Sequence, residues 1–248
     1  RVLRFPQIAA GSMLAFAVGA TLYGAIVIFP QYVQSALGFT ATLSGELIFV
    51  RAIFIAVGTP LVVRLATSGR IDTRILLVIG FLLVGSAQLV FAHVTTSSSD
   101  FGTFVLPNIM AGVGLSMLFI PISIAMLNGL APHVIPKAAS FQSLSLQLGG
   151  SISTAALVTL LDRRSAFHQD VLAQYAQPAY APFARLIAHH ASLGQFYADV
   201  VREASVMSFA DCQFVLGVLA IALMPLVFVL PKRRTGPGAG APINLSVE

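Results

Sequence analysis

Six apolar runs, each long enough to cross a lipid bilayer as a helix, constrain the fold of this chain more than any other feature. The hydrocarbon core of a bilayer is about 30 Å thick, and a helix needs about 20 apolar residues to cross it. The runs are longer than barrel strands and do not alternate in hydropathy, so the sequence predicts an all-α membrane protein with six transmembrane helices. The predicted spans lie near residues 8–29, 43–63, 75–92, 104–127, 138–161 and 206–230.

The composition supports the same fold class. Of the 248 residues, 57% are hydrophobic and only 9% are charged, whereas soluble domains carry about 25% charged residues. A soluble protein could not cover its surface with so few charges, so most of this surface is predicted to face lipid. The formal net charge of +5 sits mainly between the apolar runs, which is typical of membrane topology and argues against a nucleic-acid partner.

The distribution of basic residues predicts how the chain lies in the membrane. The segments between successive spans lie on alternating sides of the membrane. Nine Lys and Arg residues then fall on the same side as the N-terminus and four on the other side, and Arg51 lies inside a span. The positive-inside rule then predicts that both ends of this chain are cytoplasmic. The nine are Arg1, Arg4, Arg64, Arg70, Arg74, Lys137, Lys232, Arg233 and Arg234, and the four are Arg163, Arg164, Arg185 and Arg202.

We therefore predict one six-helix transmembrane domain over residues 1–231 and a disordered cytoplasmic tail over 232–248, which is rich in Gly and Pro. Residues 162–205 are predicted to form a long outer loop. Its apolar residues recur at helical spacing, around Phe167 and around Phe183, which fits either short amphipathic helices on the membrane surface or a solvated loop with some helix.

Several spans carry small or polar residues along one face. The fifth span has such a face, made of Ser140, Ser143, Gln147, Ser151 and Thr154. Small residues let helix backbones approach closely in lipid, where no hydrophobic force drives helices together. The amides of Asn108, Gln142 and Gln147 fit two interpretations, interhelical hydrogen bonding and the lining of a solute path.

Three ionisable residues lie within predicted spans. Arg51 lies near the middle of the second span, where a charge costs at least about 2.5 kcal/mol, so it should face the bundle interior and meet an acceptor. Glu46 lies five residues earlier, roughly 140° round the helix, and is shallower. Asp211, about five residues into the sixth predicted span, could cap that helix or titrate in a cavity. These three residues and the three amides are the candidate substrate and proton pathway.

The sequence carries no signal for enzyme chemistry. The zinc-protease, phosphate-loop, nucleophile-elbow and dinucleotide motifs are all missing. His189 and His190 are adjacent without further ligands at metal spacing, and the single cysteine, Cys212, lies in an apolar run as a small hydrophobe would. We therefore predict no catalytic residue, no metal site and no cofactor.

Several stretches, in this order and spacing, resemble one family. They are Arg1–Phe5, Phe39–Thr42 followed by Ser44 and Gly45, Arg51, Pro107–Pro121, Gln147–Ile152, His168 and Asp211. Together they resemble the C-terminal half of the major facilitator superfamily, in the fourteen-helix drug:proton antiporter group of EmrB/QacA type. The resemblance covers about residues 1–231. Leu146 departs from it, because the family often has Arg there, and residues 63–68 are a degenerate copy of the family's Gly-Arg-Leu-Ala-Asp-Arg motif.

The resemblance implies export of hydrophobic, cationic or amphipathic compounds across the inner membrane, driven by proton entry. It implies a substrate site between two six-helix halves, of which this chain supplies one, and rocking between inward-open and outward-open states. The implied partners are the small-molecule substrate, protons, the lipid bilayer and a missing N-terminal half. Some Gram-negative relatives also work with a periplasmic adaptor and an outer-membrane channel.

Two other interpretations stay open at this point. One is a transporter of the same fold with a single specific solute, which substrate-dependent proton flux would separate from multidrug export. The other is a non-transporting membrane module that binds a partner, which predicts a stable short protein without flux.

Overall fold

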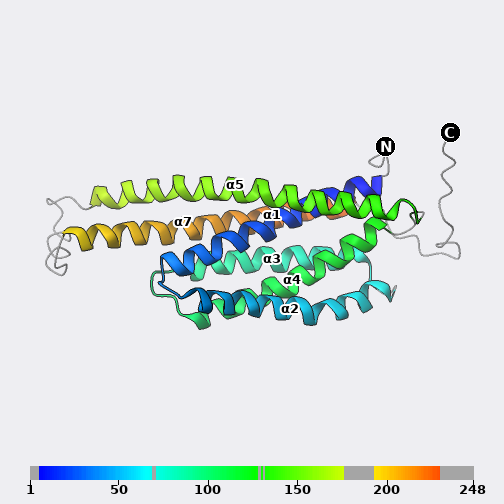
Figure 1. Cartoon of the computed structure of the whole chain (residues 1–248), viewed down its shortest axis with the longest axis horizontal. Coiled ribbons are helices and arrows are strands. Elements are labelled where there is room, and N and C mark those ends of the chain that lie inside the picture. The colour runs from blue at the N-terminus through cyan, green and yellow to red at the C-terminus, as the bar shows by residue number, and fades with distance from the viewer. Residues whose placement is uncertain (1–5, 69–70, 128–129, 131, 176–192, 230–248) are drawn as a thin grey trace.

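The computed structural model is a bundle of long helices that run roughly along one axis (Figure 1). It describes residues 6–68, 71–127, 130, 132–175 and 193–229. The helices are α1 (Pro6–Ser35), α2 (Ala41–Thr67), α3 (Thr73–Val94), α4 (Phe101–Leu127), α5 (Ile135–Tyr175) and α7 (Leu193–Leu223), and a 3-10 segment η2 (Met224–Val229) follows α7 directly. The described residues contain six helices that are long and apolar enough to cross a membrane and no strand. The predicted all-α fold with six spans is confirmed.

Local sequence explains where these helices begin and end. The Thr40 hydroxyl accepts a hydrogen bond from the Leu43 amide at 3.2 Å, and the Asp72 carboxylate accepts one from the Arg74 amide at 3.1 Å. Both contacts satisfy amide groups that the first turn of a helix leaves unpaired. Pro225 lies in η2, where its missing N–H is compatible with the change from α to 3-10 geometry.

The two ends of the bundle are named here by α1. At the Ser35 end α1 and α3 finish and α2 and α4 begin; at the Pro6 end α1, α3 and α5 begin and α2 and α4 finish (Figure 1). The helices α1 and α5 pack along each other, as do α2 with α4, α3 with α4 and α3 with α7. This pairing leaves α2 and α5 as the least covered helices of the bundle.

The segment expected as a long outer loop differs in the structure. The helix α5 continues without a break to Tyr175, and α7 already begins at Leu193, so helix covers most of the described part of residues 162–205. With 41 residues, α5 is about 60 Å long at about 1.5 Å per residue, twice the thickness of the hydrocarbon core. Of the two interpretations offered for this segment, helix around Phe167 agrees with α5. Polarity marks the membrane boundary, whereas a helix can continue past that boundary when a second helix packs on it.

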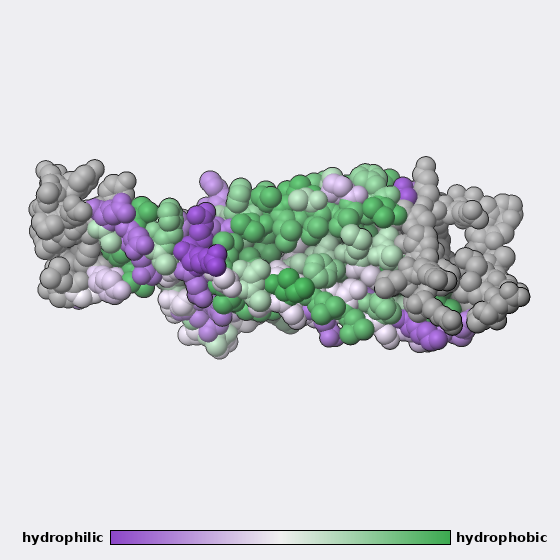
Figure 2. All heavy atoms as spheres, turned by 90° about the horizontal axis from the view of Figure 1, so that it is seen from above, coloured by the Kyte–Doolittle hydropathy of each residue, from purple (hydrophilic) through white to green (hydrophobic). Residues whose placement is uncertain are grey.

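The extension beyond the other helices is a pair, since α5 and α7 lie side by side there (Figure 1). Hydrophobic residues cover the middle of the face seen in Figure 2, and hydrophilic residues gather towards the two ends. The predicted surface helix around Phe183, the tail over 232–248, and Arg1, Arg4, Arg70 and Arg185 lie outside the described residues.

The core has two main parts. Phe29, Phe91 and Phe104 are almost fully buried towards the Ser35 end, with ring centroids 5.1 to 6.3 Å apart. Towards the Pro6 end the core is mainly aliphatic, with the buried ring of Phe81, and the backbones of α1 and α5 approach closely. A Cβ atom placed on Gly149 of α5 would lie only 2.1 Å from the Phe16 carbonyl oxygen of α1. The small-residue face predicted to pack helices therefore does so between α1 and α5.

Candidate functional site

A groove runs along α1 and α5, the second of which is one of the two least covered helices of the bundle. Its volume is about 660 Å³, and it is lined by Tyr23 of α1 and by Gln147, Ser151, Thr154, Ala155 and Val158 of α5. Gln147 and Ser151 are exposed. An uncovered polar face is costly in lipid, where each unpaired polar group loses its water partners. This face therefore fits a neighbour other than lipid, such as a polar path or a further part of the protein.

Gln142 lies on the same helix nearer the Pro6 end but has a different environment. Its side-chain nitrogen donates to the Ser123 hydroxyl of α4 at 2.7 Å. Both side chains are partly buried. Of the two predicted amides of the fifth span, Gln142 thus makes an interhelical hydrogen bond, while Gln147 lines the groove.

Arg51 and Asn108 meet inside the bundle. Arg51 on α2 is 5% exposed, and its Nε donates to the Oδ1 of Asn108 on α4 at 3.1 Å. Asn108 is fully buried, and its Nδ2 donates to the Phe104 carbonyl at 2.8 Å. The Phe91 ring of α3 lies against the guanidinium, 5.8 Å from its centroid to the Arg51 Cζ atom. One cation therefore joins three helices.

The Arg51 contacts are all with neutral groups. Asp211 forms ion pairs with Arg164 and His168, and among the described residues no carboxylate forms an ion pair with Arg51. A buried cation is costly unless it is paired and hydrogen-bonded, and an amide oxygen and a ring face compensate only part of that cost. The expectation that Arg51 faces inward and meets an acceptor agrees with this geometry.

Glu46 does not join this cluster. It lies on α2 one and a half turns before Arg51 and is exposed, whereas Arg51 is buried. The two residues therefore lie on different faces of α2, as their spacing predicts. No hydrogen bond or ion pair within the described residues assigns Glu46 a role.

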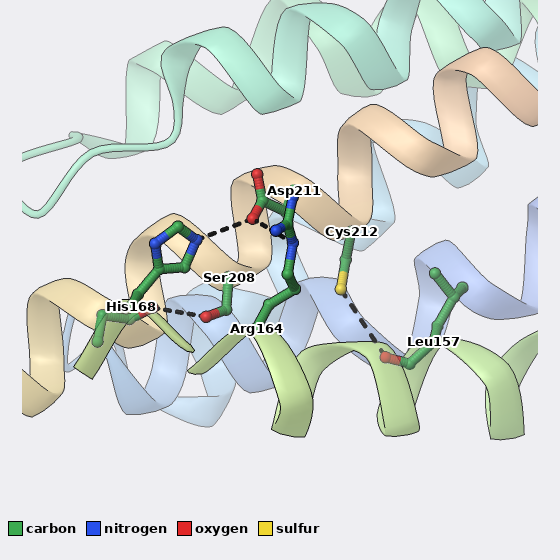
Figure 3. A network of polar contacts seen from close by, with 7 residues as sticks. Leu157, Arg164, His168, Ser208, Asp211 and Cys212 are labelled. Carbon is green, nitrogen blue, oxygen red and sulfur yellow. Dashed lines mark hydrogen bonds and ion pairs between the residues drawn. The ribbon is translucent and has the colours of Figure 1, made fainter. Parts of the chain in front are cut away.

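Asp211 lies deep inside α7, eighteen residues after its first residue. The helix-capping interpretation of Asp211 is therefore wrong, because the helix begins well before the apolar run. Its Oδ2 instead lies 3.0 Å from the Arg164 Nε and 2.8 Å from the His168 Nε2, both on α5 (Figure 3). The three side chains point towards one another across the two helices and form a partly buried charge cluster.

The sequence analysis identified Asp211 as a candidate but did not predict that Arg164 and His168 pair with it. Arg164 and His168 are spaced four residues apart, and so lie on one face of a helix, but this signal counts only once α5 is known to continue there. Cys212 follows Asp211 and is fully buried, and its thiol faces the Leu157 carbonyl at 3.8 Å (Figure 3). It packs as the small hydrophobe that the sequence predicts.

The sequence analysis gave no structural or functional role to Arg202, which the structure shows to connect three helices. Arg202 of α7 donates from Nε to the Ala36 carbonyl at 2.6 Å and from Nη2 to the Ser97 carbonyl at 2.9 Å. Ala36 directly follows α1, and Ser97 lies between α3 and α4. Arg202 thus fastens α7 to the ends of α1 and α3 with two charge-assisted hydrogen bonds.

Two further amides are buried in the bundle and are not among the predicted site residues; one of them, Gln88, was expected at the membrane interface. Gln88 of α3 and Gln213 of α7 are 2% and 3% exposed, and their side-chain oxygens have no hydrogen-bond partner within the described structure. Among the described residues, no group of three or more His, Cys, Asp or Glu side chains is arranged to hold a metal ion.

Comparison with known proteins relates this bundle to exporters. The chain is 25% identical over 227 residues to the multidrug export protein EmrB of Escherichia coli K12, an alignment that covers 88% of this chain and 44% of EmrB. It is 25% identical over 241 residues to the fatty acid resistance protein FarB of Neisseria gonorrhoeae, with 91% of this chain and 46% of FarB covered.

A third relative comes from a Gram-positive bacterium. The uncharacterised MFS-type transporter YcnB of Bacillus subtilis 168 is 29% identical over 166 residues, which cover 67% of this chain and 34% of YcnB. No family model matches the sequence. The chain spans about half the length of the curated relatives that it matches along most of its length.

The relatives and the fold agree, because six apolar helices are half of a major facilitator fold and the chain covers about half of EmrB and of FarB. Along most of its length the chain is similar to EmrB-like transporters of the major facilitator superfamily.

Proposed function

We propose that this chain is the C-terminal half of a proton-coupled exporter of hydrophobic and amphipathic compounds, located in the inner membrane. The observation that carries the proposal is the uncovered polar groove along α1 and α5, lined by Tyr23, Gln147 and Ser151. A groove of about 660 Å³ has the volume of a small-molecule site. The N-terminal half, acting as the partner, would cover it and complete a path between the two halves.

The charge distribution supports an orientation with the Pro6 end in the cytoplasm. Arg64, Arg74 and Lys137 lie at that end, in the last turn of α2 and the first turns of α3 and α5. The Ser35 end mixes basic residues with Asp100, Asp162 and Glu203. The positive-inside rule then favours cytoplasmic ends for this chain.

Two polar clusters outside the groove lining complete the proposed machinery. Arg51 and Asn108 form a buried polar link between α2 and α4, and transmembrane charges of this kind usually belong to ion or substrate paths. Asp211 with His168 offers a carboxylate and an imidazole in contact at 2.8 Å, and we propose this pair as the proton-carrying group of the chain. Glu46 and Gln142 are assigned to the same path as supporting residues.

The partners follow from this proposal. The substrate is a hydrophobic or cationic small molecule, protons supply the driving force, and the N-terminal half completes the bundle. A periplasmic adaptor and an outer-membrane channel are proposed as further partners of the whole protein in a Gram-negative cell.

Efflux from intact cells that express the full-length protein tests the proposal. We expect accumulation of a fluorescent lipophilic dye to fall on expression and to recover when a protonophore collapses the proton gradient. Gln147→Leu, which removes the amide from the groove, should reduce efflux, whereas Leu82→Ala, at an exposed apolar position of α3 outside the groove, should not. Efflux that persists without a proton gradient would reject proton coupling, and unchanged efflux in Gln147→Leu would reject the groove as the path.

A further inference from the structure

A second cavity lies at the Ser35 end, where α1, α5 and α7 come together. Its volume is about 590 Å³, and six of its eight lining residues are polar. Gln31 and Gln34 come from α1, Asp162 and Ser165 from α5, and Ser205 and Phe209 from α7. It shares no lining residue with the groove along α1 and α5, so it is a separate feature of the bundle.

The cavity presents hydrogen-bond acceptors. The Ser35 hydroxyl donates to the Gln31 carbonyl at 2.5 Å, and the Ser205 hydroxyl donates to the Val201 carbonyl at 2.8 Å. Each hydroxyl proton is therefore turned to its own helix, and the oxygen lone pairs remain for a ligand. The Asp162 carboxylate adds full negative charge, and the glutamine amides can turn their oxygens inward.

The nearby cations do not neutralise Asp162. Arg164 pairs with Asp211, and Arg202 donates to two backbone carbonyls. Arg163 projects away from the lining, since successive residues are separated by about 100° round a helix and the lining residues Leu161, Asp162 and Ser165 share one face of α5. Within the described residues, no salt bridge is formed by Asp162.

One lining side chain of the cavity, Phe209 of α7, is aromatic and is 5% exposed. Phe209 lines the cavity and is held by Tyr32, with ring centroids 5.2 Å apart. A fixed ring face attracts a cation that comes within about 6 Å of its centroid. Carboxylate, hydroxyl lone pairs and a ring around one cavity of ligand size form a set that suits an aromatic organic cation better than an anion or a metal ion.

We propose that this cavity is a second binding site, specific for lipophilic organic cations, at the Ser35 end of the bundle. The site needs neither a proton gradient nor movement of the helices, so it extends the proposed function without depending on it. In a whole transporter it would hold a cation at the mouth of the bundle, apart from the groove between the halves.

The test uses propidium, a fluorescent aromatic dication, and the purified full-length protein in nanodiscs of zwitterionic lipid. Fluorescence polarisation gives the Kd. We expect saturable binding by the unmodified protein and a Kd about fivefold higher for Asp162→Asn, the upper end for an exposed charge pair. Phe209→Leu should raise the Kd about two- to fivefold. Asp162→Glu should keep the affinity, as should Asp170→Asn, which removes an exposed carboxylate eight residues further along α5.

The outcomes separate this site from the proposed export. Binding of propidium by Asp162→Asn with the affinity of the unmodified protein overturns the second site, and so does the lack of saturable binding in the unmodified protein. An equal loss of affinity in Asp162→Asn and Asp170→Asn also overturns it, because it shows a general charge effect. Dye efflux from cells is measured independently, so a protein that binds propidium at Asp162 but exports nothing rejects only the proposed function.

Discussion

The two halves of the bundle are held together by different means. Towards the Pro6 end, helix backbones touch directly, as where Gly149 lies against the Phe16 carbonyl. Towards the Ser35 end, long side chains also reach between helices, as Arg51 does to Asn108 and Arg202 to Ala36 and Ser97. A close backbone approach occurs at Arg51 too, where a Cβ atom on Gly112 would lie 2.6 Å from the Arg51 carbonyl oxygen. Close backbone packing forms a rigid unit, whereas polar side chains can exchange partners at little structural cost. We therefore propose that movement of this bundle is concentrated in the polar side-chain contacts of the Ser35 end.

Removal of the buried cation should have the largest effect of all. We expect Arg51→Ala to abolish transport by the intact protein, because the variant loses the link from α2 to Asn108 and to the Phe91 ring. Membrane insertion should remain normal, since a midplane Arg costs at least about 2.5 kcal/mol that the variant avoids. Dye efflux and the amount of protein in purified membranes measure the two effects separately.

Arg51→Lys sharpens this first test. Lysine keeps the charge but has no Nε–H fork to donate to Asn108, so we expect most transport to remain lost. Arg163→Ala, which removes an exposed arginine of α5, is the matched control and should export normally. Normal efflux by Arg51→Ala would reduce Arg51 to a structural link and remove the reason to place function in this half.

Gly149 tests the rigid side of the comparison. We expect Gly149→Ala to destabilise the protein by about 3 kcal/mol or more, the upper range for overpacking, because its Cβ would lie 2.1 Å from a backbone oxygen that cannot turn away. Thermal unfolding of the purified protein, followed by loss of the monodisperse peak, measures the effect. Gly45→Ala on α2 is the control, since a Cβ there meets no atom within 4 Å.

The outcome for Gly45→Ala has its own expected sign. Alanine favours helix over glycine by up to about 1 kcal/mol, so this variant should be as stable as the unmodified protein or slightly more so. Equal melting temperatures for Gly149→Ala and Gly45→Ala would contradict the close approach of α1 and α5, and with it the rigid half of the comparison.

The sequence predicted the close helix packing towards the Pro6 end better than the polar contacts at the Ser35 end. Small residues at helical spacing are a local pattern that marks close packing, and Gly149 and Gly150 lie at the contact of α1 and α5. The inward position of Arg51 was also predictable, because a charged side chain in a span is costly in lipid and therefore faces the bundle interior or a water-filled cavity. The lengths of the apolar runs alone were enough to predict the six membrane-spanning helices.

The contacts at the Ser35 end could not be predicted in the same way. Arg202 bonds to Ala36, 166 residues away in sequence, and such a pairing depends on tertiary packing that no local pattern encodes. The cluster of Asp211 with Arg164 and His168 requires α5 to continue past the membrane boundary, whereas polarity suggested a loop. Hydropathy reports where lipid ends and does not report where a helix ends.

Substitution of Arg202 should change stability less than Gly149→Ala does. We expect Arg202→Ala to lower stability by about 1–3 kcal/mol, because the Ala36 and Ser97 carbonyls lose charged donors at a partly buried site. The loss should appear as faster amide hydrogen exchange at the ends of α1 and α3 and leave the Pro6 end unchanged. Exchange that speeds up equally at both ends would contradict a separate polar fastening, and Arg163→Ala again serves as the control.

The smallest expected effect is a change of pH dependence at Asp211. Asp211→Asn keeps the shape of the side chain but removes the negative charge that pairs with both Arg164 and His168. We expect the pH profile of transport to shift while the bundle stays folded. Transport by proteoliposomes over a range of external pH measures this, with Asp170→Asn as a control that removes a carboxylate outside the cluster. The helices α5 and α7 would still pack through buried neighbours such as Leu157 and Cys212, whose contact does not depend on charge. A profile identical to that of the unmodified protein would therefore assign the cluster a structural role alone, and the polar contacts left to explain movement at the Ser35 end would be those of Arg51 with Asn108 and of Arg202 with Ala36 and Ser97.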